Sequence, residues 1–160
     1  MLAPERMENY WLQWQVGMQC ETALTIVSLI FGCVLERLPD LRIAFAHSGG
    51  AYPALVGRLE HDFNVRPDLV AIQNEVNPKE YIGKFTLDSL IHDADMLRYL
   101  IGLVGAECIA LGSDYPFPLG EPEPGFLIES MDDFSAETKE RLLAGTALEW
   151  LGQSKEMYDR

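Results

Sequence analysis

The sequence predicts an α/β fold with a parallel sheet of about three strands and flanking helices. Three short apolar segments, each typical of a buried strand, alternate with longer segments that have a helical pattern. Small or polar residues follow each apolar segment directly, as they do where strands end near a ligand site. Because strands that alternate with helices are joined by crossover connections, the sheet is expected to be parallel.

The first half of the chain is predicted to contain two helices around one strand. Residues 21–37 form a strongly apolar helix candidate, which Pro39 ends. Residues 41–46 are apolar throughout, as expected for a strand buried on both faces. After a short turn, a helical pattern covers residues 51–62, and the prolines and asparagines of residues 64–78 favour a loop.

The second half repeats the alternation of strand and helix. Residues 84–88 and 107–111 are strand candidates. The amphipathic segment 93–104 between them predicts a helix that Asp93 caps and Gly105 ends. Prolines and glycines then favour a loop over residues 116–124.

Two short helices are predicted to close the chain, with Ser135 and Gly145 as their N-caps. The acidic residues between positions 132 and 140 are interpreted as a solvated face.

Composition favours one globular domain over residues 1–160. Hydrophobic residues make up 48% and charged residues 23% of the 160, which is ordinary for a protein with a packed core. The net charge of −13 makes the chain a poor partner for nucleic acid or for an anionic membrane.

A cytoplasmic location is expected from three further features of the sequence. Residues 1–7 carry no apolar core of a secretion signal, and the apolar stretch 24–34 is too short to span a bilayer. The three cysteines form no metal-binding or disulfide motif and fit reduced, buried thiols.

Two polar side chains end predicted strands and suggest an active-site floor. His47 follows the apolar run 41–46, and Asp114 follows 108–111 in a segment that two prolines stop. Because ligands and metals bind at the carboxyl ends of parallel strands, both are candidate functional residues. Asp88 ends the middle strand and could orient polar groups there. A turn role for Asp114 and a core role for His47 remain alternatives.

Three segments resemble the aminocarboxymuconate-semialdehyde decarboxylases of the amidohydrolase superfamily. They are Phe45–Pro53 with Gly57-Arg58, then Asn64–Leu69, then Leu111–Glu121. The resemblance runs from about Arg6 to Gly152 and covers only the carboxyl-terminal half of the family's (β/α)₈ barrel, whose whole length is about 250 residues. It therefore implies a partial barrel formed by residues 1–160.

The family implies a zinc-dependent carboxy-lyase that acts on an aminocarboxymuconate semialdehyde or a close analogue. Asp114 matches a zinc ligand, and His47 matches a catalytic residue that helps to deprotonate a metal-bound water. Arg58 and Arg66 match residues that hold substrate carboxylates in a neighbouring subunit's site, which implies a homodimer. Trp14 matches an aromatic residue of the pocket. No redox cofactor is implied.

Simpler interpretations exist for Arg58, Arg66 and Trp14. Arginines usually lie on solvated surfaces, and Trp11 and Trp14 have the spacing of a helix face that packs into a core. His61 and His92 are interpreted as structural or exposed.

The chain also departs from the family pattern. The family binds zinc with an H-x-H pair and a further histidine, whereas the histidines here are His47, His61 and His92, with no H-x-H. The family's His-Gly-Gly-Gly reads His47-Ser48-Gly49-Gly50. We therefore expect a fragment or a natural truncation. Another decarboxylase or hydrolase of the superfamily, and a non-catalytic chain, remain alternatives.

Overall fold

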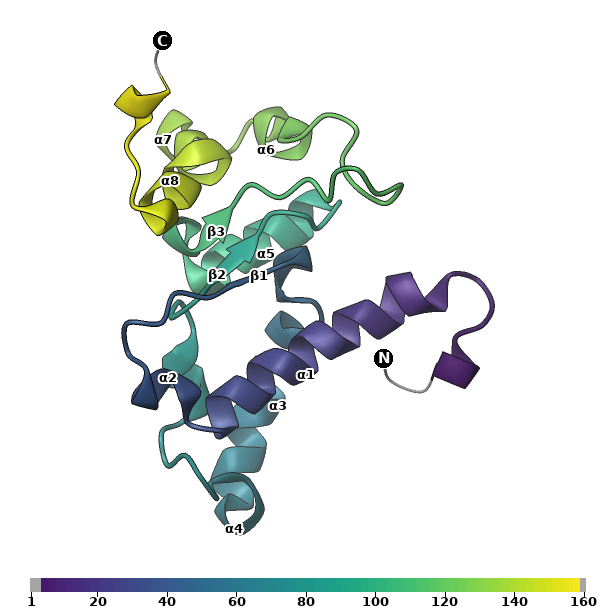
Figure 1. Ribbon diagram of the computed structural model, residues 1–160, viewed down its shortest axis with the longest axis vertical. Helices are drawn as coiled ribbons and strands as arrows, with labels where there is room; N and C mark the ends of the chain where they lie inside the picture. The colour runs from purple at the N-terminus through teal and green to yellow at the C-terminus, as the bar shows by residue number, and fades with distance from the viewer. Residues whose placement is uncertain (1–3, 159–160) are drawn as a thin grey trace. The chain divides into compact units, whose positions relative to one another are not determined.

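The computed structural model describes residues 4–158 and divides into two compact units. Residues 1–41 and 49–82 form one, here called the helical unit. Residues 42–48 and 83–160 form the other, here called the sheet unit. Figure 1 labels the helices and strands of both.

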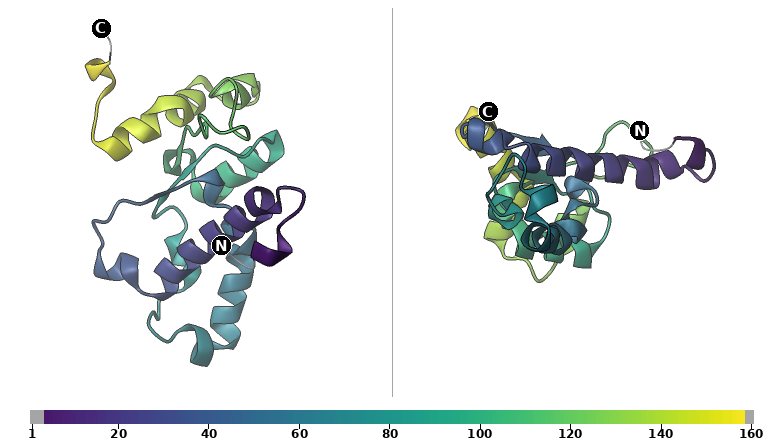
Figure 2. Two further views of the ribbon diagram at one scale, coloured as in Figure 1. Left: turned by 45° about the vertical axis from the view of Figure 1, so that its right-hand side comes forward. Right: turned by 90° about the horizontal axis from the view of Figure 1, so that it is seen from below.

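The helical unit is built on two helices that pack against each other, α1 (Met18–Phe31) and α3 (Tyr52–Val65) (Figure 2). A π-helical turn, Gln13–Gly17, leads into α1, and a 3₁₀ turn, Pro4–Arg6, lies near the start of the chain. The core of this unit is formed by apolar and aromatic side chains from α1, α3 and a later 3₁₀ turn: Ala23, Ile26, Ile30, Tyr52, Val56 and Tyr81.

The predicted helix over residues 21–37 is two helices. It begins earlier, at Met18, and a second short helix, α2 (Val34–Arg37), follows a break. Cys33 has a φ of 58°, in the left-handed region, which an α-helix cannot continue through. Gly32 and Cys33 therefore end α1 before Pro39 is reached.

The predicted loop over residues 64–78 contains helical turns. α4 (Pro67–Val70) and the 3₁₀ turn Pro78–Tyr81 each begin at a proline. Proline is well suited to a first helical position because its missing N–H would have no partner there and its φ is already helical. The prolines that predicted a loop instead start short helices.

The sheet unit contains the three parallel strands that the sequence predicts. They are β1 (Ala44–Phe45), β2 (Thr86–Asp88) and β3 (Ile109–Ala110), in the order β1-β2-β3. Both pairings are parallel, with Phe45 opposite Leu87 and Asp88 opposite Ala110. The fold class is thus confirmed: an α/β structure whose strands end on one side of a small parallel sheet.

The strands are shorter than predicted, and β1 is not buried on both faces. Leu41 is 40% exposed, and Ala44 and Ala46 are exposed. β1 is an edge strand in the described part of the chain, whereas Leu87 in the central strand is fully buried. A continuous apolar run indicates a strand but does not determine whether both of its faces are covered.

Helix α5 (Ala94–Val104) confirms both predicted ends. The Asp93 side chain accepts a hydrogen bond from the backbone N–H of Met96, and Gly105 ends the helix with a φ of 85°. Leu97, Leu100 and Val104 form its buried face.

The closing helices differ from the prediction. A short helix, α6 (Phe126–Ser130), precedes them. α7 (Ala136–Glu140) begins at Ser135, as predicted. It then runs through the π-helical turn Arg141–Gly145 into α8 (Thr146–Leu151), so Gly145 lies inside a continuous helical segment that contacts β3. Gly145 itself has helical backbone angles, so the helix continues through this residue and no new helix begins there.

Two smaller expectations are also answered. Within residues 4–158 no helix is both long enough and apolar enough to cross a membrane. The three cysteines are free thiols, and all are half-buried rather than buried.

Candidate active site

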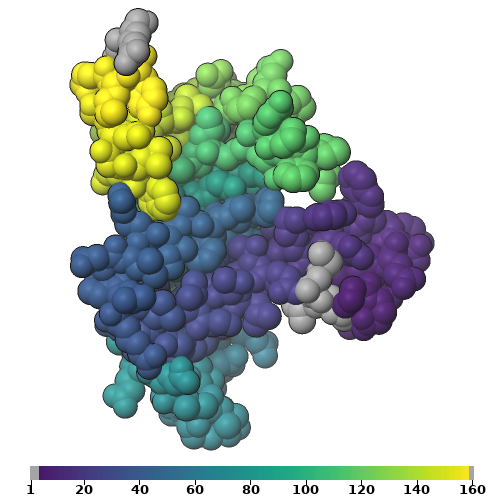
Figure 3. Space-filling view, viewed as in Figure 1, coloured from purple at the N-terminus to yellow at the C-terminus, as the bar shows by residue number. Residues whose placement is uncertain are grey.

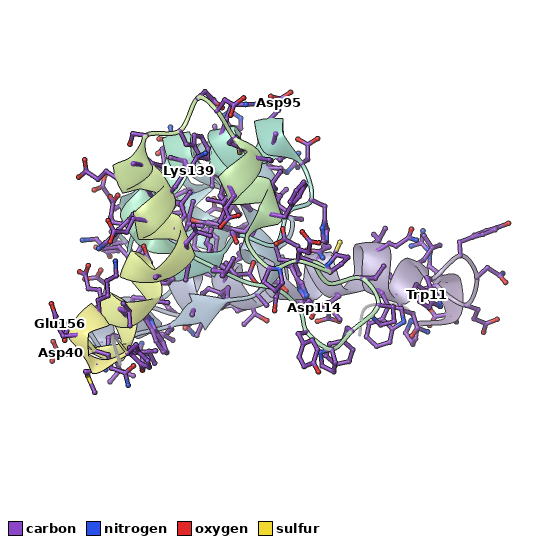
Figure 4. The ribbon with its side chains drawn as sticks, turned by 90° about the horizontal axis from the view of Figure 1, so that it is seen from above. Trp11, Asp40, Asp95, Asp114, Lys139 and Glu156 are labelled. Carbon is purple, nitrogen blue, oxygen red and sulfur yellow. The ribbon has the colours of Figure 1, made fainter. Side chains whose placement is uncertain are left out.

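The carboxyl ends of β1 and β3 bring His47 and Asp114 together in the sheet unit. Nε2 of His47 lies 3.8 Å from Oδ1 of Asp114. The two side chains are 17% and 24% exposed, so each is partly shielded from water and still accessible. Because 3.8 Å is too long for a hydrogen bond, the contact is an ion pair only when the imidazole is protonated. Figure 4 shows Asp114 on the turn that follows β3.

A run of left-handed backbone holds His47 at the end of β1. His47 and Ser48 have φ values of 56° and 55°, and Gly49 and Gly50 continue with 78° and 60°. For residues other than glycine this conformation costs roughly 1–2 kcal/mol each, so interactions nearby must offset it. Nδ1 of His47 is buried and has no hydrogen-bond partner in residues 4–158, which leaves Nε2 as the nitrogen that faces other groups.

The Asp88 carboxylate stabilises this strained turn. Its Oδ2 accepts a hydrogen bond from the His47 N–H at 2.9 Å, and its Oδ1 accepts from the N–H of Ser48 at 2.7 Å and of Leu90 at 3.1 Å. Successive backbone N–H groups that point to the same side of a turn can form a concave anion-binding site. Here the anion is a side chain of the neighbouring strand.

Burial raises the pKa of the Asp88 carboxyl above its ordinary value, although the hydrogen bonds from Ser48, His47 and Leu90 lower it. A buried carboxylate is unfavourable because it has lost its hydration. Burial outweighs the hydrogen bonds in the direction of the shift.

Ser89, the residue after Asp88, makes the corresponding contacts to β3. Its N–H donates to the Ala110 carbonyl at 2.9 Å, and its hydroxyl accepts from the Gly112 N–H at 3.3 Å. Ser89 is 1% exposed. The end of the central strand is therefore hydrogen-bonded to the chain on both sides.

The loop after β3 is organised by its own backbone. The Asp114 carbonyl accepts from the Phe117 N–H at 2.8 Å, and the Ser113 carbonyl accepts from the Glu121 N–H at 2.9 Å. The loop presents two aromatic side chains to solvent, since Tyr115 is 85% and Phe117 65% exposed. In Figure 3 the loop after β3 is part of the green surface.

The other candidate residues belong to the helical unit. Trp14 lies in the π-helical turn and is 44% exposed, and Trp11 is 54% exposed, so neither packs into a core (Figure 4 labels Trp11). Arg58 on α3 is exposed, with its Nε 3.7 Å from Asp62. Arg66 forms a two-pronged pair with the Asp68 carboxylate, at 2.9 and 2.7 Å.

The metal site that the sequence leads us to expect at Asp114 is not complete within residues 4–158. Asp114 offers an anionic oxygen ligand, but nowhere in residues 4–158 do three or more His, Cys, Asp or Glu side chains form a group that could hold a metal ion. Zinc normally takes three or four protein ligands. The residues described here therefore do not fit a complete metal centre by themselves.

Two site residues were not singled out from the sequence. Ser89 and Gly112 differ little from ordinary turn residues, and their contacts appear only once β2 and β3 are paired. The signal that could have found them is position, since both follow strand candidates directly. His61 and His92 are exposed, in agreement with the interpretation given to them.

Comparison with known proteins shows which family the sequence matches. The family model described as amidohydrolase matches residues 5–153. A 2-amino-3-carboxymuconate-6-semialdehyde decarboxylase of Dictyostelium discoideum is 56% identical over 99% of this chain and 44% of its own length. An enzyme of the same name from Caenorhabditis elegans is 48% identical over 91% of this chain and 36% of its own length. The chain thus spans less than half the length of these relatives.

Two solved structures have the same fold. The 5-carboxyvanillate decarboxylase of Sphingomonas paucimobilis matches with a TM-score of 0.81 and 21% identity, over 95% of this chain and 46% of that one. A dihydroxybenzoic acid decarboxylase of Polaromonas, which contains manganese and an inhibitor, matches with a TM-score of 0.74 and 18% identity. That match covers 99% of this chain and 49% of the other.

Proposed function

Because this chain belongs to the amidohydrolase family, we propose that it forms the carboxyl-terminal half of the barrel of a metal-dependent carboxy-lyase. The substrate is an aminocarboxymuconate semialdehyde or a close analogue. The names of the relatives that are 56% and 48% identical support this substrate class.

One observation carries the proposal, namely the 3.8 Å separation between His47 Nε2 and Asp114 Oδ1. Both groups extend from the carboxyl ends of parallel strands, where active sites of α/β barrels lie. A carboxylate is a ligand for a divalent metal, and an imidazole changes its protonation near neutral pH. The two together supply a ligand and a proton carrier at one place.

In the proposed reaction the bond between carbon and the carboxylate breaks, and carbon dioxide leaves without its electron pair. The carbon that keeps the pair must then take up a proton. His47 holds and moves that proton, because its Nε2 faces the site while its Nδ1 is buried.

Arg58 and Arg66 bind the carboxylates of the substrate in a partner subunit's site, and Trp14 lines the pocket. Arg66 already holds the Asp68 carboxylate with both prongs of its guanidinium group, which is the geometry that a substrate carboxylate needs. A homodimer in the cytoplasm is part of this proposal, and the free cysteines suit a reducing compartment.

Zinc is the metal that we propose, with Asp114 as one ligand. Bound zinc would act as a Lewis acid and lower the pKa of a coordinated water. Its other ligands lie outside residues 4–158, since the described side chains supply no complete site.

A chimera tests the function directly. In it, this chain replaces the matched segment of the Dictyostelium decarboxylase, so that the rest of that enzyme completes the site. We expect the chimera to bind metal and to release one carbon dioxide for each aminocarboxymuconate semialdehyde consumed. The 160-residue chain alone should do neither. A folded, metal-loaded chimera without turnover would contradict the proposed reaction, and turnover by the chain alone would contradict the external ligands.

A further inference from the structure

We propose that Asp88 and Ser89 are positioning residues that set the distance between the His47 imidazole and the Asp114 carboxylate. That this distance matters for catalysis rests on the proposed function. That Asp88 and Ser89 set it is argued from the hydrogen bonds of the sheet unit.

Asp88 and Ser89 lie between the two sides of the site. β2 is the central strand, and Asp88 and Ser89 lie at its carboxyl end. Asp88 binds the backbone of His47 and Ser48 after β1, and the Ser48 hydroxyl donates to the Asp88 carbonyl at 3.1 Å. Ser89 binds the backbone of Ala110 and Gly112, which leads into the Asp114 turn.

Asp88 acts through His47 rather than on a substrate. Both of its carboxylate oxygens accept hydrogen bonds from backbone N–H groups, one from His47 and two from Ser48 and Leu90. These three hydrogen bonds direct the carboxylate at the backbone of the turn rather than at the His47 and Asp114 side chains. Its hydrogen bond to the His47 N–H stabilises the left-handed backbone that carries the imidazole.

Only a carboxylate satisfies this turn completely. In an asparagine, one oxygen would be replaced by an NH₂ group, which cannot accept a hydrogen bond. Either the His47 N–H or the Ser48 N–H would then face a donor, and a buried N–H without an acceptor is unfavourable. The left-handed backbone at these two residues would lose the interaction that offsets its strain.

Gly112, two residues after β3, leaves no room for a side chain of its own beside Asp88. A Cβ atom at position 112 would lie 2.6 Å from Cβ and 2.8 Å from Cγ of Asp88, well inside van der Waals contact. The backbone just after β3 therefore packs directly against the Asp88 side chain. An added methyl group would push Asp88 away from its three donors.

The test compares Asp88→Asn with Asp93→Asn. Asp93 is in the same unit and also accepts a backbone N–H, from Met96 at 2.8 Å, but asparagine caps a helix as well as aspartate does. Both variants remove one negative charge, so a difference between them cannot come from the change in charge. We expect only Asp88→Asn to disturb the site. Gly112→Ala should act like Asp88→Asn, whereas Gly102→Ala, which meets no atom within 4 Å, should not.

Two measurements on the 160-residue chain need no activity. Amide hydrogen exchange at His47 and Ser48 should become at least about tenfold faster in Asp88→Asn and Gly112→Ala, and stay unchanged in the two controls. In crystal structures, the His47 Nε2 to Asp114 Oδ1 distance should change by roughly 1 Å or more. An unchanged distance would overturn the proposal, whatever the kinetics show.

Kinetics in the chimera separate positioning from folding. Misplacement of a catalytic group by roughly 1 Å costs about a hundredfold in rate, so kcat should fall by up to that factor while KM and metal content stay nearly constant. A parallel loss of folded protein and activity, with normal kcat in the folded fraction, would contradict it. If the unmodified chimera is inactive, the proposed function fails while the distance and exchange results still decide the positioning role.

Discussion

Nε2 of His47 lies 3.8 Å from Oδ1 of Asp114, although 66 positions of sequence separate the two residues. Neither side chain donates a hydrogen bond to the other at this distance. Their proximity results from the parallel order β1-β2-β3, which places the ends of the outer strands on either side of Asp88 and Ser89. The two groups are therefore expected to have separable roles.

Substitution of each residue should separate those roles. In the chimera, Asp114→Ala should lose the metal together with the activity, because an anionic ligand is removed. His47→Ala should retain the metal and lose about 10²–10⁴-fold in kcat, the usual contribution of a positioned acid or base. Metal analysis and steady-state kinetics on the same samples check both. His61→Ala, an exposed histidine on α3, is the control. Loss of metal from His47→Ala would reassign His47 as a ligand.

Mixed dimers should reveal which subunit provides Arg66. His47→Ala and Arg66→Ala should each be inactive in the chimera. If Arg66 serves the partner's site, a dimer with one copy of each has one intact site, and random mixing should restore about a quarter of the activity. If Arg66 serves its own subunit, no site is intact and nothing is restored. His47→Ala mixed with Asp114→Ala is the control, and it should stay inactive because those residues belong to one unit.

The sequence predicted the strands, their parallel direction and the residues that end them, because a run of apolar residues next to a polar one is local information. It did not predict that Cys33 interrupts the first helix, or that a helical segment runs through Gly145. Such features depend on backbone angles, which composition constrains weakly. The exposure of Ala44 and Ala46 was missed because burial of a strand depends on what lies beside it.

The residues of the site, too, could be predicted only where the local sequence determines their position. His47 and Asp114 could be found by position, since each follows a strand directly. The function of Asp88 as acceptor for three N–H groups depends on left-handed angles at His47 and Ser48, which are unusual for these residue types. No local pattern predicts them.

The stability of the chain should report the environment of Asp88 through its pH dependence. Burial raises the folded-state pKa of this carboxyl above 3.8, so the folded state binds the proton more tightly than the unfolded state. The stabilisation that comes from binding this proton is therefore fully present below about pH 3.8 and is lost as the pH rises through the folded pKa. The unfolding free energy of the wild type minus that of Asp88→Asn, measured with urea between pH 7 and pH 4, should increase as the pH falls.

Asp133 provides a control of opposite sign. Its hydrogen bonds to Arg98 lower the pKa of this exposed carboxyl to about 2. Its contribution is present above pH 3.8 and is lost as the pH falls toward 2, so the difference between wild type and Asp133→Asn should decrease on acidification. Equal pH slopes for the two substitutions would contradict the assignment of Asp88 as buried.

The stability of the helical unit should depend on Asn74, which the sequence places in a loop. Asn74 is 2% exposed, and its amide donates to the Ile30 carbonyl at 2.6 Å and to the Tyr81 hydroxyl at 2.8 Å. Its oxygen accepts from the Val76 N–H at 2.9 Å, and the Tyr81 hydroxyl donates to Glu36 at 3.0 Å. One side chain thus connects the end of α1, the 3₁₀ turn and the segment between them.

Asn74→Ala should lower the free energy of unfolding by about 2–4 kcal/mol, because it leaves buried donors and acceptors without partners. Urea denaturation followed by circular dichroism measures the change. Asn77→Ala is the matched control: this asparagine, three residues on, accepts one hydrogen bond from the Lys79 N–H at an exposed position. Its loss should cost about 1 kcal/mol or less. Equal losses for the two variants would show that the buried network does not stabilise the unit beyond an ordinary cap.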